Sequence, residues 1–272
     1  MFTLRQYLLA LLDSRGLTRT LGEIDVCRDE QGRPCFSAGN SAAVFRIRLG
    51  GRIRSLRCYL RPMRHLKEIY GQRLLEKELY LHTSPETGVW VDTVLGNWIE
   101  GSTLHETVAQ AAALRDRESL QILVRLFDRL ALALVTDDRA HGDLKPENII
   151  VGDDGTLCPI DFDASYLPAF AGEISPELGT AAYQHPARTA ADFDERIDDY
   201  PAALISTALH ALAEDPTLWD RYGSSDGLLY TPQRIASDPA YRETLALFEK
   251  RGMAVQYRIA QLLTAPTLRL FG

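Results

Sequence analysis

The sequence predicts an α+β fold of two lobes, in which a small antiparallel sheet with one internal helix is followed by a helical lobe. Residues 23–60 form short runs of alternating apolar and polar side chains, separated by turns that contain glycine. This pattern is typical of an antiparallel meander. After Gly101 most segments instead have apolar side chains at helical spacing. A length of 272 residues suits one bilobal domain, and we expect its lobes to be residues 1–100 and residues 101–272.

The first lobe is expected to begin with an additional helix, because residues 2–14 have helical spacing and Gly16 ends the pattern. In the meander that follows, Gly50-Gly51 is a strong signal for a tight hairpin. Residues 63–82 return to helical spacing and predict the internal helix of this lobe. The last two strands of the lobe are expected over residues 88–95 and 97–101, on either side of Gly96.

The second lobe is expected to be mainly helical. Residues 117–137 have an apolar face too wide for a surface helix, which predicts a helix at the centre of a core. Two short apolar runs flank the turn at residues 152–155 and predict a small hairpin. Residues 163–196 contain several Gly and Pro residues and predict a long loop region. The other helices are expected over residues 103–113, 198–213, 238–250 and 253–264.

The composition is that of an ordinary soluble globular protein, with 46% hydrophobic and 25% charged residues. A net charge of −7 argues against a nucleic-acid-binding surface, because such surfaces are usually basic. No apolar run approaches the roughly 20 residues that a membrane span needs. The four cysteines include no CxxC pair, which favours reduced thiols over a zinc site or a disulfide framework. We therefore expect a cytoplasmic protein with no nucleic-acid and no membrane partner.

One constellation of polar residues carries the functional prediction. The segment HGDLKPENIIV places Asp143, Lys145 and Asn148 within six positions, and Asp161 follows a second short apolar run. Phosphoryl transfer needs a metal clamp on the phosphates, a carboxylate beside the attacking hydroxyl and positive charge on the transferred group. Magnesium takes hard oxygen ligands, which Asp161 and the side-chain oxygen of Asn148 can supply. The sequence therefore predicts a nucleotide site, in a cleft between the two lobes.

These residues resemble motifs of the protein kinase family. HGDLKPEN is similar to the catalytic loop H-R-D-L-K-P-E-N, and residues 161–163 are similar to D-F-G. Residues 179–187, GTAAYQHPA, resemble the end of the activation segment, G-T-x-x-Y-x-A-P-E. Asp198 matches the Asp that opens the central helix of the large lobe, and residues 97–101 resemble the hinge. The motifs occur in the family's order over roughly residues 35–210.

The resemblance implies a single bilobal protein-kinase-like domain, with a sheet-rich N-lobe and a helical C-lobe, that uses ATP and Mg²⁺. In such a site Asp143 positions the acceptor hydroxyl and Lys145 stabilises the γ-phosphate. Asn148 and Asp161 hold Mg²⁺. The family also implies that His141 packs and forms hydrogen bonds in the core and does not act as a catalytic base.

The ATP-binding residues of the first lobe match the family less closely. Residues 37–44, SAGNSAAV, stand in the place of the loop G-x-G-x-x-G-x-V and keep Gly39 and Val44. Residues 55–58, SLRC, form the strand that aligns with V-A-I-K. Strand alternation places Arg57 on the same side as Ser55, facing the cleft, so Arg57 stands where the family has lysine. Arginine keeps the positive charge, but its planar fork is not equivalent to an ammonium group at a phosphate. The alternative for Arg57 is a solvated side chain in an Arg-rich strand.

The resemblance also implies a carboxylate partner for Arg57 on the internal helix, and Glu76 fits this place best. The backbone of the hinge at Asn97 and Ile99 is expected to bind adenine. The alternative carboxylates on the same predicted helix are Glu68 and Glu78.

Three residues depart from the family's motifs. Gly142 replaces the Arg of H-R-D, Asp163 replaces the Gly of D-F-G, and Ala187 replaces the Glu of A-P-E. The H-G-D and D-F-D forms resemble small-molecule kinases of the choline and aminoglycoside type. Lys145 together with Gly179-Thr180 instead resembles the serine/threonine protein kinases.

The first hypothesis is therefore an ATP- and Mg²⁺-dependent serine/threonine protein kinase whose partners are ATP and a protein substrate. The second is a pseudokinase that acts as a binding or regulatory module, which Arg57 and the eroded glycine loop favour. The third is a small-molecule kinase of the choline or aminoglycoside type. Transfer of a nucleotidyl group also stays open, because it needs the same metal clamp.

Overall fold

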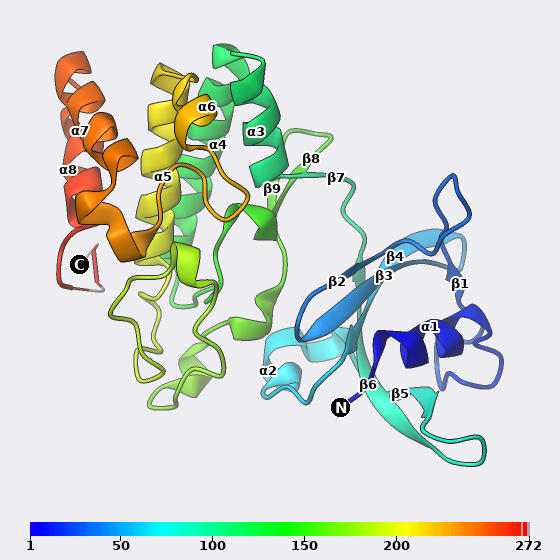
Figure 1. Cartoon of the computed structure of the whole chain (residues 1–272). Helices are drawn as coiled ribbons and strands as arrows, with labels where there is room; N and C mark the ends of the chain where they lie inside the picture. Colours follow the sequence, from blue (N-terminus) through cyan, green and yellow to red (C-terminus); the bar gives the residue numbers. More distant parts are fainter. Residues whose placement is uncertain (268, 271–272) are drawn as a thin grey trace. The chain divides into compact units, whose positions relative to one another are not determined.

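The computed structural model describes residues 1–267 and 269–270 (Figure 1). The chain divides into two compact units, the first from Met1 to Trp98 and the second from Ile99 onward. The first unit contains an antiparallel sheet and the second is mainly helical. This arrangement confirms the predicted α+β fold class.

A six-stranded antiparallel sheet forms the first unit, in the order β1-β3-β4-β6-β5, with β2 beside β3. The hairpin between β3 and β4 turns at Gly50 and Gly51, and both have positive φ. This is the backbone that a tight hairpin turn requires and that glycine adopts without steric cost. The strands are β1 (Asp25–Val26), β2 (Phe36–Ala38), β3 (Ala42–Leu49), β4 (Arg52–Tyr59), β5 (Leu74–His82) and β6 (Gly88–Asn97).

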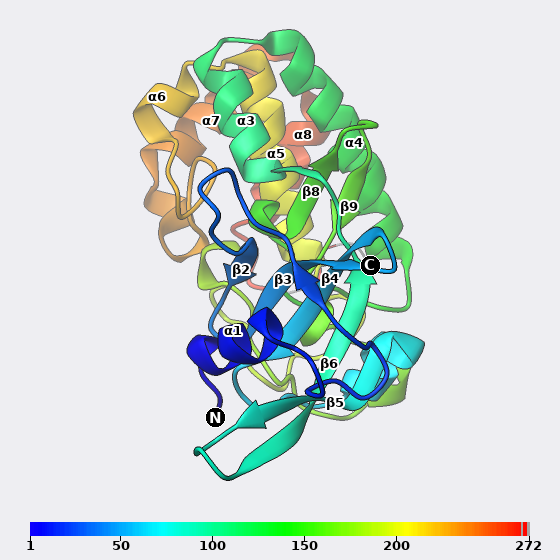
Figure 2. The same ribbon diagram turned by 90° about the vertical axis from the view of Figure 1, so that its right-hand side faces the viewer.

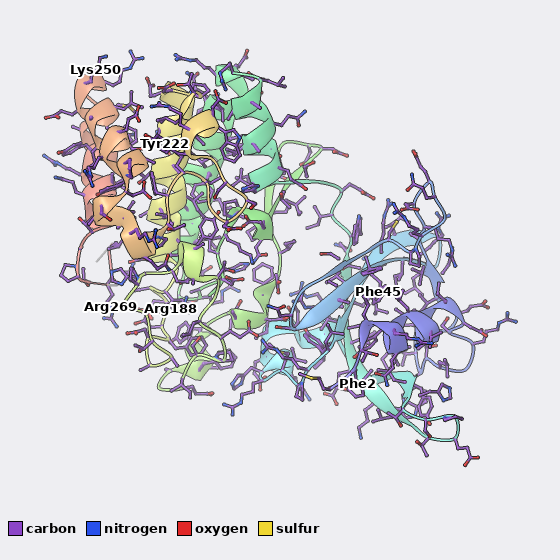
Figure 3. The ribbon with its side chains drawn as sticks, viewed as in Figure 1. Phe2, Phe45, Arg188, Tyr222, Lys250 and Arg269 are labelled. Carbon is purple, nitrogen blue, oxygen red and sulfur yellow. The ribbon has the colours of Figure 1, made fainter. Side chains whose placement is uncertain are left out.

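Helix α1 (Leu4–Leu12) covers one face of this sheet (Figure 2). It begins at Thr3, whose hydroxyl accepts from the Gln6 N–H while the Gln6 side chain accepts from the Thr3 N–H. Such a capping box satisfies backbone donors that the first helical turn leaves open. Its apolar side packs on inward-facing side chains of β3 and β4, and Figure 3 labels one of them, Phe45. The predicted N-terminal helix is therefore confirmed.

The internal helix predicted over residues 63–82 is wrong. Only α2 (Leu66–Tyr70) is helical there, and residues 74–82 form strand β5 on the outer side of β6. Leu79 and Leu81 are fully buried at the alternating spacing of a strand, so pairing with β6 overrides the helical pattern. The strand predicted over residues 88–95 is confirmed as part of β6. The separate strand predicted over residues 97–101 is wrong, because β6 continues through Gly96 to Asn97.

The second unit contains a helical core around α5 (Asp199–Glu214), which is buried along most of its length. The prediction that residues 117–137 form the central helix is half right. They form α4, but this helix buries one side only and leaves Leu132 63% exposed. Helix α6 was not predicted. The remaining elements are α3 (Leu104–Ala113), α4 (Arg117–Thr136), α6 (Leu218–Tyr222), α7 (Pro239–Arg251) and α8 (Ala254–Leu262), with strands β7 (Gly101–Thr103), β8 (Ile149–Gly152) and β9 (Leu157–Pro159).

The cysteines, one ion pair between helices and the character of the helices complete the description of the fold. All four cysteines are free thiols, as predicted, although only Cys58 is buried. Arg251 of α7 lies 3.3 Å from Glu214 of α5 and ties these two helices of the second unit together. Within the described residues, the helices are too short or too polar to traverse a lipid bilayer.

Candidate functional site

The loop that carries Asp143 connects α4 to β8 and is tied to the central helix of the second unit. Asp198, the residue before α5, is 1% exposed and accepts hydrogen bonds from the backbone N–H groups of His141 and Gly142, the latter at 3.0 Å. Gly142 has φ +80°, and a Cβ atom at this position would lie 2.0 Å from the carbonyl oxygen of Ala164. Both the conformation and the close approach therefore require glycine.

His141 is buried behind the loop and holds its shape. Its Nε2 atom lies 2.8 Å from the carbonyl oxygen of Ile160, and its ring packs on Phe162 with centroids 4.9 Å apart. Its Nδ1 atom accepts from the N–H of Asp143 at 3.4 Å. An accepting Nδ1 assigns a ring proton to Nε2, which can then donate to the Ile160 carbonyl. His141 thus has the packing role that the sequence predicted.

Asp143, Lys145 and Thr180 form one connected group at the mouth of the loop. The Oδ1 atom of Asp143 accepts from the Thr180 N–H at 2.5 Å, and its Oδ2 atom lies 3.6 Å from Lys145 Nζ. Lys145 Nζ also donates to the Thr180 hydroxyl at 2.9 Å. The side chains of Lys145 and Asp143 are 23% and 18% exposed, so the two charges interact in a largely desolvated site that still reaches solvent.

Asn148 is oriented by Asp143. Its Nδ2 atom donates to the Asp143 carbonyl oxygen at 2.9 Å and to Oδ2 at 3.2 Å. The Asn148 Oδ1 atom therefore points away from Asp143 and remains available as a ligand. The β8–β9 hairpin pairs Ile149 with Pro159, and the Ile160 N–H donates to the Asn148 carbonyl at 2.8 Å.

Asp161 follows at once on the β9 side of this hairpin, so the hairpin register brings it beside Asn148. Asp161 has φ +68°, a conformation that residues other than glycine seldom adopt and that often marks functional sites. Asp163 is buried two residues later, in a turn of 3₁₀ helix. Across residues 1–267 and 269–270, no three His, Cys, Asp or Glu side chains converge on one point.

The oxygen atoms of Asn148 and Asp161 are hard ligands of the type that Mg²⁺ takes. Magnesium commonly binds one or two protein oxygens together with substrate phosphates and water, and not a closed protein cage. One carboxylate and one amide oxygen at the open end of the β8–β9 hairpin fit that kind of metal site.

In the first unit, Val44 and Arg57 lie on one face of the sheet. They are direct cross-strand partners in β3 and β4, and Arg57 also pairs with Val94 of β6. Cross-strand partners point to the same side, which here is the side opposite the buried Phe45. The Arg57 guanidinium carbon lies 5.8 Å from the centroid of the Tyr59 ring.

Gly39 lies in the tight turn between β2 and β3, where its N–H donates to the Ala42 carbonyl at 2.9 Å. A Cβ atom at Gly39 would meet only that carbonyl, at 3.9 Å, so the turn itself does not demand glycine. At the end of β6, the Asn97 carbonyl accepts from the Ser55 hydroxyl at 3.1 Å. Ile99 is a half-buried residue between β6 and β7.

The prediction for Glu76 depended on a helix and is wrong. Glu76 lies in strand β5 and forms an exposed ion pair with Lys67 at 3.3 Å. Glu78, its alternative, has a structural role instead. It is 1% exposed, and its carboxylate accepts three backbone N–H groups and one hydroxyl from residues 19–21, at 2.6 to 3.1 Å.

One residue of the site, Arg188, was missed by sequence reasoning. Arg188 Nη1 donates to the Gly142 carbonyl oxygen at 3.1 Å and to the side-chain oxygen of Gln184. Burial lowers the pKa of Arg188, whereas the carboxylates of Asp198 and Asp143 act to raise it. The sequence gives no local signal for this contact, because Gly142 and Arg188 are 46 residues apart.

Comparison with known proteins supports a relationship to protein kinases. No family model matches the chain. The chain is 28% identical over 172 residues to CBL-interacting protein kinase 17 of Oryza sativa subsp. japonica, an alignment that covers 60% of this chain and 35% of that protein. It is 34% identical over 113 residues to the serine/threonine-protein kinase PknL of Mycobacterium tuberculosis, covering 39% of this chain and 27% of PknL.

The chain thus spans about a third of the length of these curated relatives or less. The relatives are distant and are named protein kinases, which supports a place in the protein kinase-like superfamily and a kinase as the broad class of activity.

Proposed function

We propose that this chain is an ATP- and Mg²⁺-dependent phosphotransferase that moves the γ-phosphate of ATP to a serine or threonine hydroxyl of a protein. The observation that carries the proposal is the connected group of Asp143, Lys145 and Thr180, with Asn148 oriented by Asp143. A carboxylate, an ammonium group and an amide oxygen within one loop are the groups that phosphoryl transfer uses.

In this proposal Asp143 orients the acceptor hydroxyl and accepts its proton. Its two oxygens are held in place by the N–H of Thr180 and by the side chains of Asn148 and Lys145. Fixing the carboxylate before substrate arrives lowers the barrier, because no reorganisation is needed in the transition state. Lys145 adds positive charge where the transferred phosphoryl group carries negative charge.

Asn148 and Asp161 would hold Mg²⁺, which neutralises charge on the phosphates when it is bound. Gly39, Val44 and Arg57 of the first unit would hold the phosphates and cover the adenine, and the backbone of Asn97 and Ile99 would bind its edge. Glu76 has no part in this proposal.

A protein hydroxyl is the proposed acceptor. Lys145 bonds to Thr180 in the segment that resembles serine/threonine kinases, and PknL carries that name. The net charge of −7 favours a protein acceptor over nucleic acid.

The test is transfer of labelled γ-phosphate from ATP to a panel of proteins and to small hydroxyl compounds, followed by phosphoamino-acid analysis. Wild type is expected to label serine or threonine. Asp143→Asn is expected to lower the rate of transfer by about 10²-fold or more, since a positioned base contributes about 10²–10⁴-fold to the rate. Asp153→Asn, in an exposed turn of the same hairpin, makes the same chemical change away from the site and serves as the matched control.

Other outcomes contradict the proposal in distinguishable ways. Labelling of metabolites alone would identify a small-molecule kinase. Transfer of a nucleotidyl group would label the acceptor only when the ATP carries its label at the α-phosphate. ATP binding with no transfer to any acceptor would favour a pseudokinase, for which Arg57 in place of lysine is the specific observation.

A further inference from the structure

Position 142, beside Asp143, cannot hold a positively charged side chain. A side chain at Gly142 is excluded by φ +80° and by the carbonyl oxygen of Ala164, which lies 2.0 Å from where a Cβ atom would be. Two carboxylates, Asp143 and Asp198, nevertheless flank this glycine, and Asp198 is 1% exposed. Burying carboxylates without a nearby cation costs several kcal/mol. Lys145 lies 3.6 Å from Asp143, and because position 142 cannot hold a second cation, any further positive charge has to come from another segment.

Arg188 supplies it from a segment distant in the sequence. It follows Gly142 by 46 residues and donates to the Gly142 carbonyl oxygen at 3.1 Å. The same nitrogen donates to the side-chain oxygen of Gln184, which fixes the direction of the guanidinium. Burial lowers the pKa of Arg188, and the carboxylates of Asp198 and Asp143 are the two largest charges that act to raise it. Burial raises the pKa of Asp198, and His141 and, to a smaller extent, the guanidinium of Arg188 act to lower it.

The contacts of Arg188 do not suit a residue selected for stability alone. Its Nε and Nη2 atoms are buried and have no hydrogen-bond partner in the part of the chain that the structure describes. Unpartnered buried donors each cost about 1–3 kcal/mol. What Arg188 does contact is the peptide between Gly142 and Asp143, whose orientation sets the direction of the Asp143 side chain.

We propose that Arg188 is a positioning residue for Asp143, which holds the Gly142–Asp143 peptide by a hydrogen bond and balances the charges of Asp143 and Asp198. It stands in for the cation that the close-packed Gly142 cannot provide. The catalytic consequence depends on the phosphotransferase function proposed above, whereas the structural one does not. Arg188 touches neither the proposed metal ligands nor the proposed nucleotide-binding residues among the described contacts.

The experiment compares wild type with Arg188→Met, Arg188→Lys and Arg196→Met. Arg188→Met is expected to lower kcat by about 10²-fold, the effect of a displacement of about 1 Å in a catalytic group, with the KM for ATP unchanged. Arg188→Lys keeps the charge but cannot reproduce the guanidinium fork. Its kcat is therefore expected to lie between those of wild type and Arg188→Met. Arg196 lines the same cavity of about 140 Å³ as Arg188 but bonds to the Val135 carbonyl, and its variant is expected to keep the wild-type kcat.

A second readout does not depend on activity. The amides of His141 and Gly142, which donate to Asp198, are expected to exchange hydrogen faster in Arg188→Met than in Arg196→Met. Because Arg188 lines a cavity of about 140 Å³, methylguanidinium is also expected to restore kcat to Arg188→Ala, whereas the same concentration of sodium chloride is not.

The outcomes separate the two proposals. An inactive wild type overturns the phosphotransferase function, and the amide exchange then still tests whether Arg188 holds the loop. An active wild type whose Arg188→Met variant keeps both its kcat and its amide protection overturns the role of Arg188. A kcat loss that is equal in Arg188→Met and Arg196→Met also overturns it, because only Arg188 contacts the loop.

Discussion

Gly142→Ala measures how tightly the structure holds the Asp143 loop. Alanine at φ +80° pays the cost of a left-handed backbone, about 1–2 kcal/mol. Its Cβ would also lie 2.0 Å from the Ala164 carbonyl oxygen and 2.7 Å from the carbonyl carbon, so the backbone of residue 164 must move. Overpacking of this kind costs about 1–3 kcal/mol more. We expect a total loss of about 2–5 kcal/mol in the free energy of unfolding.

Gly155→Ala is the matched control. Gly155 has φ +77°, almost the same conformation, but nothing lies within 4 Å of its Cβ position. Its variant is expected to lose only the conformational cost of about 1–2 kcal/mol. At about 2–4 °C per kcal/mol, calorimetry or urea unfolding resolves the difference. Equal losses in the two variants would refute the argument that Ala164 closes over Gly142.

Two further predictions concern the first unit. Glu78→Gln is expected to lower the free energy of unfolding, measured in urea, by about 1–3 kcal/mol, because three backbone N–H groups donate to the carboxylate that this change removes. An unchanged free energy would show that these hydrogen bonds contribute nothing. Arg57→Lys is expected to raise the KM for ATP by about tenfold, because the guanidinium fork is lost at the phosphates. A gain in activity would instead show that the natural arginine impairs turnover.

The sequence predicted best those features that local chemistry decides. Gly50-Gly51 can form a tight turn wherever it occurs, and the hairpin at residues 149–159 brings Asn148 and Asp161 together through its own register. Their proximity therefore followed from short-range pattern alone. Their roles in binding metal and nucleotide stay predictions.

The failures arose where tertiary contacts decide. Residues 74–82 have apolar side chains that suit either a helix or a strand, and pairing with β6 selects the strand. Glu76 therefore lies in a strand and not on a helix, and it forms an ion pair with Lys67. Arg188 gave no local signal, because its contact with Gly142 joins segments that are distant in the chain.

The measurement that tests the central claim most directly is the melting temperature with ATP, with and without Mg²⁺, for wild type, Asp161→Asn and Asp153→Asn. A ligand at about 100 times its Kd stabilises by about 2.7 kcal/mol, a rise of about 5–11 °C at this size. The account predicts a Mg²⁺-dependent rise in wild type and Asp153→Asn that Asp161→Asn loses. A rise that is equal in all three proteins, or absent from all three, would contradict a metal–nucleotide site at Asp161.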